Sequence, residues 1–151
     1  SRFGFSDVLT LFLAMDCSVE LYKGGIVPLR EYAERPYDRD IVVRLLVRKE
    51  AADYCYQSVR NSQTDFPVLT CAAAKTAGGF RVAIGARPGK AVLYTLQPNA
   101  AETPELTAAR FAAEVRANIR TESNMRGSAE YRNHLAGVLV KRAVLKLEGN
   151  R

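Results

Sequence analysis

The chain has 151 residues, enough for one domain with a sizeable apolar core or for two small lobes. Apolar residues make up 48% and charged residues 25% of it, so its composition excludes a disordered or fibrous chain. The net charge of +6 is spread over basic runs of at most two residues, without zinc-finger spacing or an RNA-binding aromatic motif, so we expect no nucleic-acid partner.

Three widely spaced cysteines, Cys17, Cys55 and Cys71, bear on the cellular compartment. Their odd number argues against a disulfide framework, and an iron–sulfur cluster usually needs more thiolates than this chain has. No apolar run is long enough to cross a bilayer, so we expect a cytoplasmic protein with no membrane partner. Because the chain opens on Ser1 without an initiator Met, we expect a fragment of a longer protein.

The first part of the chain predicts a helix, a hairpin and a short helical turn. The helix opens at Ser6 and Asp7, where either side chain can cap it, and continues through a segment that is apolar on nearly all sides. Residues 17–28 alternate around a glycine turn, which is typical of a hairpin. Pro28 suits the start of a helical turn, and residues 34–40 form a polar linker.

The second part predicts strands and then two long helices. Strands are expected at residues 41–48, 53–59, 68–75 and 80–86, with Tyr54, Tyr56 and Ser58 on one face of the second strand. Thr103 and Pro104 mark the start of a helix that runs to about residue 120. Ser128 caps the closing helix, which has Tyr131, Leu135 and Leu139 on its apolar stripe.

Runs of strands followed by helices indicate an α+β fold. We expect an antiparallel three- to four-stranded sheet packed with a C-terminal helix pair and preceded by a helix plus a hairpin. No Ser-His-Asp set or metal constellation is visible, so we predict no catalytic residue and no metal site in this chain. The lone His134 fits a structural role.

The closing helix also carries a family signature, Arg126-Gly-Ser-Ala-Glu-Tyr-Arg-x-His-Leu-Ala-Gly-Val-Leu-x-x-Arg-Ala. It resembles the last helix of the FAD-binding subunits of the xanthine dehydrogenase and carbon monoxide dehydrogenase family, the molybdenum hydroxylases. Further similar segments follow the family's order and spacing: Ser6-Asp7-Val-Leu, Ile26-Val-Pro-Leu, Asp40-Ile-Val-Val, Asp65-Phe-Pro-Val-Leu and Phe80-Arg-Val-Ala-Ile-Gly. The resemblance therefore covers about residues 1–148.

The resemblance implies a domain organisation. In the family, an N-terminal lobe and a middle lobe sandwich the FAD, and a C-terminal α+β domain closes over the flavin ring. Residues 1–40 resemble the C-terminal part of the middle lobe, and residues 41–151 resemble the C-terminal domain. The N-terminal lobe and its glycine-rich loops, whose backbone N–H groups bind the diphosphate, are missing.

The resemblance also implies flavin contacts. Asp7 matches the family's acid that hydrogen-bonds FAD, with Ser6 beside it, although helix capping alone would also explain an Asp there. Ser1 falls where the family has a hydroxyl residue that contacts FAD. Val42 matches an apolar residue whose backbone contacts the flavin, a role that is compatible with a place in the strand core. Gln57 stands where the family commonly has a Lys near the flavin.

The loop that follows, residues 60–65, matches a segment that shapes nicotinamide access in the family. It keeps only Arg60 where relatives often carry several arginines, and Gln57 lacks the ammonium charge, so NAD is disfavoured as the electron acceptor. A plain polar connection between two strands would also explain this loop.

The function that the resemblance implies is that of the FAD-binding component of an oxidoreductase. In the intact enzyme, substrate is oxidised at a molybdopterin centre, and electrons pass through iron–sulfur clusters to FAD. This chain would cover and position the flavin, with the missing N-terminal FAD lobe and the molybdopterin-binding and iron–sulfur subunits as partners, and would be inactive alone. Two alternatives stay open: a flavin-free docking module of the same fold, and a small basic domain that binds an acidic partner.

Overall fold

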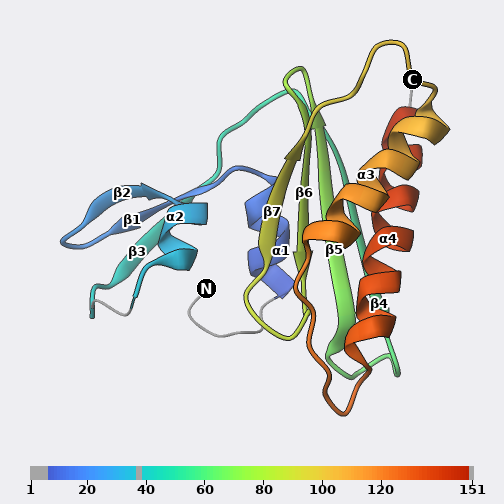
Figure 1. The fold of residues 1–151 in the computed structure, drawn as a ribbon. Helices are drawn as coiled ribbons and strands as arrows, with labels where there is room; N and C mark the ends of the chain where they lie inside the picture. The colour runs from blue at the N-terminus through green and yellow to red at the C-terminus, as the bar shows by residue number, and fades with distance from the viewer. Residues whose placement is uncertain (1–6, 37–38, 150–151) are drawn as a thin grey trace.

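The chain folds into two antiparallel sheets, and helices cover both faces of the larger one (Figure 1). This computed structural model describes residues 7–36 and 39–149. The elements in chain order are α1 (Asp7–Ala14), β1 (Ser18–Leu21), β2 (Gly25–Pro28), α2 (Leu29–Glu34), β3 (Val42–Leu46), β4 (Asp53–Arg60), β5 (Pro67–Thr76), β6 (Gly79–Gly85), β7 (Val92–Leu96), α3 (Pro104–Asn118) and α4 (Ala129–Gly149).

The larger sheet has the order β4-β5-β6-β7 and is antiparallel throughout. The helices α3 and α4 pack on one face of it, and α1 packs on the other (Figure 1). The central strand β5 is therefore buried from Pro67 to Ala74 without the alternation of a strand that has one wet face. This arrangement confirms the predicted α+β fold with a C-terminal helix pair.

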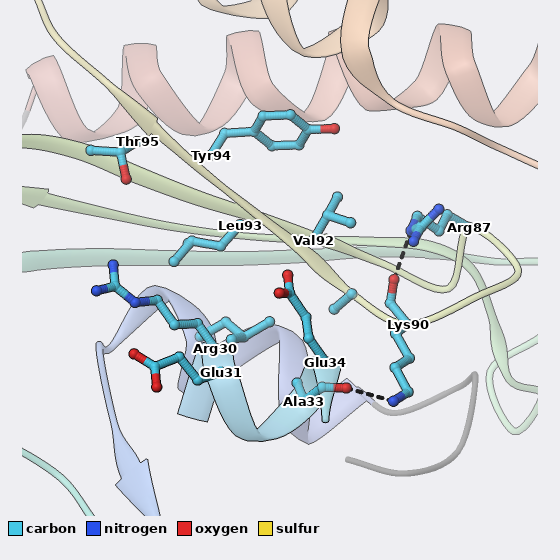
Figure 2. A pocket seen from close by; sticks show the side chains of 12 residues that line it. Arg30, Glu31, Ala33, Glu34, Arg87, Lys90, Val92, Leu93, Tyr94 and Thr95 are labelled. Carbon is cyan, nitrogen blue, oxygen red and sulfur yellow. Dashed lines mark hydrogen bonds between the residues drawn. The ribbon is translucent and has the colours of Figure 1, made fainter. Parts of the chain in front are cut away.

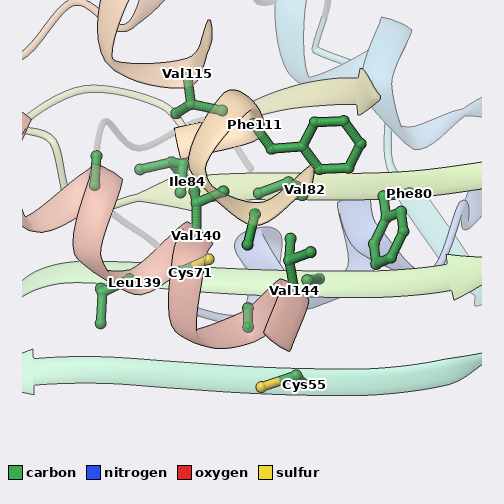
Figure 3. Packing of buried hydrophobic residues seen from close by; sticks show 14 of the residues in the cluster. Cys55, Cys71, Phe80, Val82, Ile84, Phe111, Val115, Leu139, Val140 and Val144 are labelled. Carbon is green, nitrogen blue, oxygen red and sulfur yellow. The ribbon is translucent and has the colours of Figure 1, made fainter. Parts of the chain in front are cut away.

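The main core lies between the larger sheet and the helices α3 and α4 (Figure 3). Phe80 of β6 meets Phe111 of α3 edge to face, with ring centroids 5.5 Å apart and an interplanar angle of 69°. Such an aromatic pair adds to the stabilisation from burial alone. Cys55 and Cys71 lie in the same core as buried free thiols.

The opposite face of the sheet is lined by small residues where α1 crosses it. Thr10 of α1 and Thr70 of β5 are fully buried, and their hydroxyl oxygens lie 3.1 Å apart in a hydrogen bond. A Cβ atom at Gly85 would lie 2.0 Å from Thr10 Oγ1, so only glycine permits this approach. Ala72 and Ala83 complete the contact. The start of α1 is thereby held against the sheet.

The smaller sheet has the order β2-β1-β3 and packs with α2 beside the larger one (Figure 1). The strand expected at residues 41–48 exists as β3, but it pairs with β1 of the hairpin rather than with the larger sheet. The fourth strand of the larger sheet is β7, which the sequence reasoning did not identify. A domain boundary between residues 40 and 41 stays a prediction.

The two long helices begin at the residues that were predicted to cap them. The Thr103 hydroxyl accepts from Leu106 N at 3.4 Å, and the Ser128 hydroxyl accepts from Tyr131 N at 3.1 Å. On α4, Leu135 and Leu139 are buried as expected, whereas Tyr131 is 45% exposed. The buried stripe is rotated by one position from the expected one, so that Arg132 rather than Tyr131 faces the core.

Candidate functional site

The first feature of the candidate site is an unpaired carboxylate oxygen on Asp7, the first residue of α1. Its Oδ2 accepts a hydrogen bond from Arg60 Nη2 at 2.9 Å. Its Oδ1 is buried and has no hydrogen-bond partner among residues 7–36 and 39–149, the part of the chain that the structure describes. A buried acceptor without a donor is costly, and such groups in native proteins usually mark a missing ligand or water. Asp7 thus offers an acceptor to a donor from outside the chain.

A second feature links Asp7 to the turn between β4 and β5. Arg60, at the end of β4, donates from Nη1 to the main-chain oxygen of Asp65 at 2.6 Å. The Asp65 carboxylate in turn accepts from Arg126, at 3.1 Å from Nε and 2.8 Å from Nη2. This hydrogen-bonded contact with Arg126 holds the pKa of Asp65 below its ordinary value. Asp7, Arg60, Asp65 and Arg126, hereafter the ionic chain, therefore alternate in charge.

The connection that carries Arg126 is held by a buried arginine. Arg132 is fully buried on α4 and donates from Nε to Val68 O at 2.9 Å and from Nη1 to Glu122 O at 2.7 Å. It also donates to the main-chain oxygen of Gly127 and to the side-chain oxygen of Asn124. Burial lowers the pKa of this guanidinium, yet arginine stays charged because its ordinary pKa is so high. Arg132 thereby fixes the connection between α3 and α4 to the sheet.

Tyr56 lies on the α1 side of β4, because its register partner Ala72 belongs to the cluster that packs with α1; the alternation predicted only that Tyr54, Tyr56 and Ser58 share a face. Its pKa is raised by burial and, secondly, by the negative charge of Asp7, which places the two groups in one electrostatic environment. With 41% of its surface exposed, the ring is accessible to solvent. The polar part of the candidate site therefore combines a carboxylate, a guanidinium and a phenol.

An apolar groove lies next to the start of α1. It has a volume of about 210 Å³ and lies between α1, α2 and the smaller sheet. Val8, which follows Asp7, forms its rim with 59% of its surface exposed, and Val42 of β3 faces it with 43% exposed. Phe12 and Leu45 also line it. Exposed apolar surface of this kind favours an apolar part of a ligand or a partner protein.

The predicted site residues fall into three groups. Val42 lines the apolar groove, and Asp7 directly precedes Val8, which lines it as well. The structure therefore brings Asp7 and Val42 to one region. Gln57 faces the other side of the larger sheet, where its Nε2 lies 3.4 Å from Leu139 O of α4. Ser1 and Ser6 lie outside the described residues, so their predicted roles stay predictions.

Sequence reasoning missed the partners of Asp7. It singled out Arg60 as the one arginine kept in its loop, but not its pairing with Asp7, 53 positions away. It treated Arg126 only as part of a family signature and did not foresee that Arg132 would be buried. The side of the sheet on which Tyr56 lies relative to Gln57 could be predicted, because successive side chains of a strand point to opposite faces.

A larger pocket, of about 650 Å³, lies between α2 and β7 (Figure 2). Its two basic side chains already donate to main-chain oxygens of the pocket wall: Lys90 Nζ to Ala33 O at 2.5 Å, and Arg87 Nε to Lys90 O at 2.6 Å. Glu31 and Glu34 of α2 add negative charge at its rim. Of the predicted site residues that the structure describes, Asp7, Val42 and Gln57, none lines this pocket, and its mixed charges single out no ligand class.

Two further properties of the described residues bound the chemistry. Among residues 7–36 and 39–149, no three or more His, Cys, Asp and Glu side chains gather where they could hold a metal ion. No helix of this described part combines the length and apolarity that crossing a bilayer requires.

Comparison with known proteins gives a family and a fold. The sequence model of the CO dehydrogenase flavoprotein C-terminal domain matches residues 54–147. The uncharacterized protein YgfM of Escherichia coli K12 is 26% identical over 136 residues, which are 89% of this chain and 51% of YgfM. The chain therefore spans about half the length of this curated relative.

Solved structures similar to the chain come from two kinds of oxidoreductase. Quinoline 2-oxidoreductase from Pseudomonas putida 86 matches with a TM-score of 0.78 and 17% identity, over 98% of this chain and 57% of that one. Carbon monoxide dehydrogenase from Hydrogenophaga pseudoflava matches with a TM-score of 0.82 and 18% identity, over 98% and 58%. Carbon monoxide dehydrogenase from Oligotropha carboxidovorans gives 0.79 and 19%, over 99% and 58%. At this identity the likenesses show a shared fold.

Proposed function

The chain belongs to the family of CO dehydrogenase flavoprotein C-terminal domains, and from this premise we propose that it forms one side of an FAD site in an oxidoreductase complex. Bound FAD would supply the hydride and electron chemistry, and the protein would bind, orient and shield it. The single observation that carries this proposal is the buried, unpaired Oδ1 of Asp7.

The residues present fit a flavin nucleotide. FAD combines a flat, largely apolar ring with N–H and hydroxyl donors, and Asp7 Oδ1 is an acceptor that lacks a donor. The apolar groove beside it, lined by Val8, Phe12 and Val42, suits the apolar part of such a ligand. We assign Asp7 to hydrogen bonding and the backbone at Val42 to contact with the ring system.

The other residues predicted to contact FAD are Ser1, Ser6 and Gln57. Ser1 and Ser6 stay proposed FAD ligands in addition to Asp7. Gln57 faces α4 rather than the Asp7 side of the sheet, so we leave it out of the set that touches the cofactor directly. The argument for an electron acceptor other than NAD then rests on the loop at residues 60–65, which keeps only Arg60 where the family often carries several arginines.

A second lobe would complete the site. A diphosphate needs clustered backbone N–H groups, and the glycine pairs Gly24-Gly25 and Gly78-Gly79 are taken up by hairpin turns. The open side of β3 displays Ile41 at 66% and Val43 at 52% exposure. We propose that the N-terminal FAD lobe of a flavin-binding subunit, whether covalently continuous or separate, covers this surface and binds the diphosphate.

Subunits that carry molybdopterin and iron–sulfur clusters are the proposed further partners. One of the similar structures is described as a Cu,Mo-CO dehydrogenase, and another as a carbon monoxide dehydrogenase that lacks the Mo-pyranopterin moiety of its cofactor. The three cysteines of this chain are free and buried, which suits the reducing cytoplasm as the location of such a complex.

The proposal is tested by FAD titration of the protein purified in its native assembly. Asp7→Asn should weaken FAD binding by about tenfold, because a charge-assisted hydrogen bond is replaced by a neutral one. The matched control is Asp53→Asn, an exposed aspartate at the far end of β4, and it should bind FAD like the parent. A parent protein that takes up no FAD would leave the flavin-free docking module as the better account.

A further inference from the structure

The ionic chain raises a question that the proposed function does not answer, namely what holds Asp7 in the orientation that keeps Oδ1 unpaired. The Asp7 side chain retains 32% of its surface exposure and the Arg60 side chain 31%. A carboxylate at this exposure is free to rotate about χ2 unless a partner fixes it. Arg60 is that partner, since its Nη2 holds Oδ2 at 2.9 Å.

Arg60 is itself fixed at two points. One end of its planar guanidinium binds Asp7 while Nη1 donates to Asp65 O at 2.6 Å. A planar guanidinium that donates to two acceptors is fixed in both position and orientation. A lysine ammonium on its flexible side chain is not fixed in this way. The geometry of Asp7 therefore depends on where the turn holding Asp65 lies.

That turn is anchored to the helical layer. Arg126 grips the Asp65 carboxylate with two nitrogens, and Asn61 Nδ2 donates back to Arg126 O at 3.2 Å. The Arg126 guanidinium also lies over the Phe66 ring, with its carbon 5.3 Å from the ring centroid. The α3–α4 connection thus fixes the turn through Arg126, and the turn fixes Arg60, which in turn contacts the start of α1 on the opposite face of the sheet.

Resting on the proposed function, we propose that Arg60 is a positioning residue of the flavin site, which turns the Asp7 carboxylate so that Oδ1 accepts a hydrogen bond from an N–H or hydroxyl group of FAD. Asp65 and Arg126 hold Arg60 in place and do not touch the cofactor. Arg60 therefore acts on FAD only through Asp7.

Stability alone does not account for this arrangement. Ion pairs this exposed contribute little to folding, so a purely structural Arg60 would bring little benefit. Among the described residues, Asp7 Oδ1 is meanwhile buried without a hydrogen-bond partner, which is unfavourable unless a ligand supplies a donor. Both observations are explained if the pair is arranged for a ligand.

The test is a double-mutant cycle on FAD affinity, measured by flavin fluorescence titration of the protein in its native assembly. The variants are Asp7→Asn, Arg60→Met and the two combined. Each single variant should weaken binding by about tenfold. The double variant should bind no worse than Asp7→Asn alone, because Arg60 has no route to FAD once the carboxylate is gone.

Two more variants separate positioning from charge and from folding. Arg60→Lys keeps the positive charge but loses the planar guanidinium that donates to two acceptors. Its FAD affinity should therefore lie between those of the parent and of Arg60→Met. Arg110→Met removes another arginine that pairs with a carboxylate, Glu102, and donates to a main-chain oxygen, that of Gln97; it lies on α3, on the face of the larger sheet opposite α1, and should leave FAD affinity unchanged. Thermal unfolding midpoints should match for Arg60→Met and Arg110→Met; if Arg60→Met unfolds earlier, Arg60→Lys carries the test.

The outcomes are distinguishable. Parent-like affinity in Arg60→Met, together with weak binding in Asp7→Asn, would overturn the positioning role and leave the flavin site standing. Effects that multiply in the double variant would show that Arg60 acts independently of Asp7, which also overturns it. A parent that binds no FAD defeats the proposed function, and this inference with it.

Discussion

The close approach of α1 to the larger sheet makes Gly85→Ala a sharp test of the fold around Asp7. The added Cβ would lie 2.0 Å from Thr10 Oγ1 and 2.7 Å from Thr70 Oγ1, and both threonines are fully buried and branched. Overpacking of this kind costs about 1–3 kcal/mol, and the displaced hydroxyl contact costs about 1 kcal/mol more. We expect the free energy of unfolding to fall by about 2–4 kcal/mol.

Urea unfolding followed by circular dichroism measures this loss. The control is Gly78→Ala, where the nearest atom to the added Cβ is Thr76 Oγ1 at 3.7 Å, and its effect should stay within about 0.5 kcal/mol. Because Thr10→Ala removes the closest clashing atom, Gly85→Ala should cost less in that background than in the parent. Equal stability losses in Gly85→Ala and Gly78→Ala would refute the packing of α1 described above.

Two further predictions concern charged groups. Arg132→Met removes four donated hydrogen bonds, and although Gly127 O and Asn124 Oδ1 each keep a backbone N–H donor, the free energy of unfolding should fall by about 3 kcal/mol. Arg142→Met, which is exposed on the same helix, should change it little in the same urea titration. Arg81 holds the pKa of Glu50 below its ordinary value of 4.5. Stability from this pair is therefore present above pH 4.5 and is lost as pH falls through the lower folded pKa, so Glu50→Gln should flatten the acid slope of stability.

Local signals in the sequence predicted the elements that local physics determines. Thr103-Pro104 and Ser128 marked helix starts because a capping hydroxyl acts within one turn. The strand that became β3 was also found, but its partner was not, because pairing with β1 joins segments far apart in the chain. The strand β7 has the β-branched and aromatic residues of Val92–Leu96, a signal that was present and overlooked.

The candidate site was predictable only in part, for a related reason. Asp7 stood out by its position at a helix start and by family resemblance, yet its pairing with Arg60 is a tertiary contact that no spacing rule gives. A wholly buried arginine such as Arg132 runs against the usual preference of charged residues for the surface. Its role follows only from the carbonyls that the fold gathers around it.

The central claim is that the chain forms one side of a site for FAD, and the visible absorption spectrum of the protein in its native assembly tests it most directly. The account predicts flavin absorption bands, with FAD released on denaturation in one-to-one ratio to the chain, and a lower ratio in Asp7→Asn. A colourless parent that stays colourless after incubation with added FAD would contradict it.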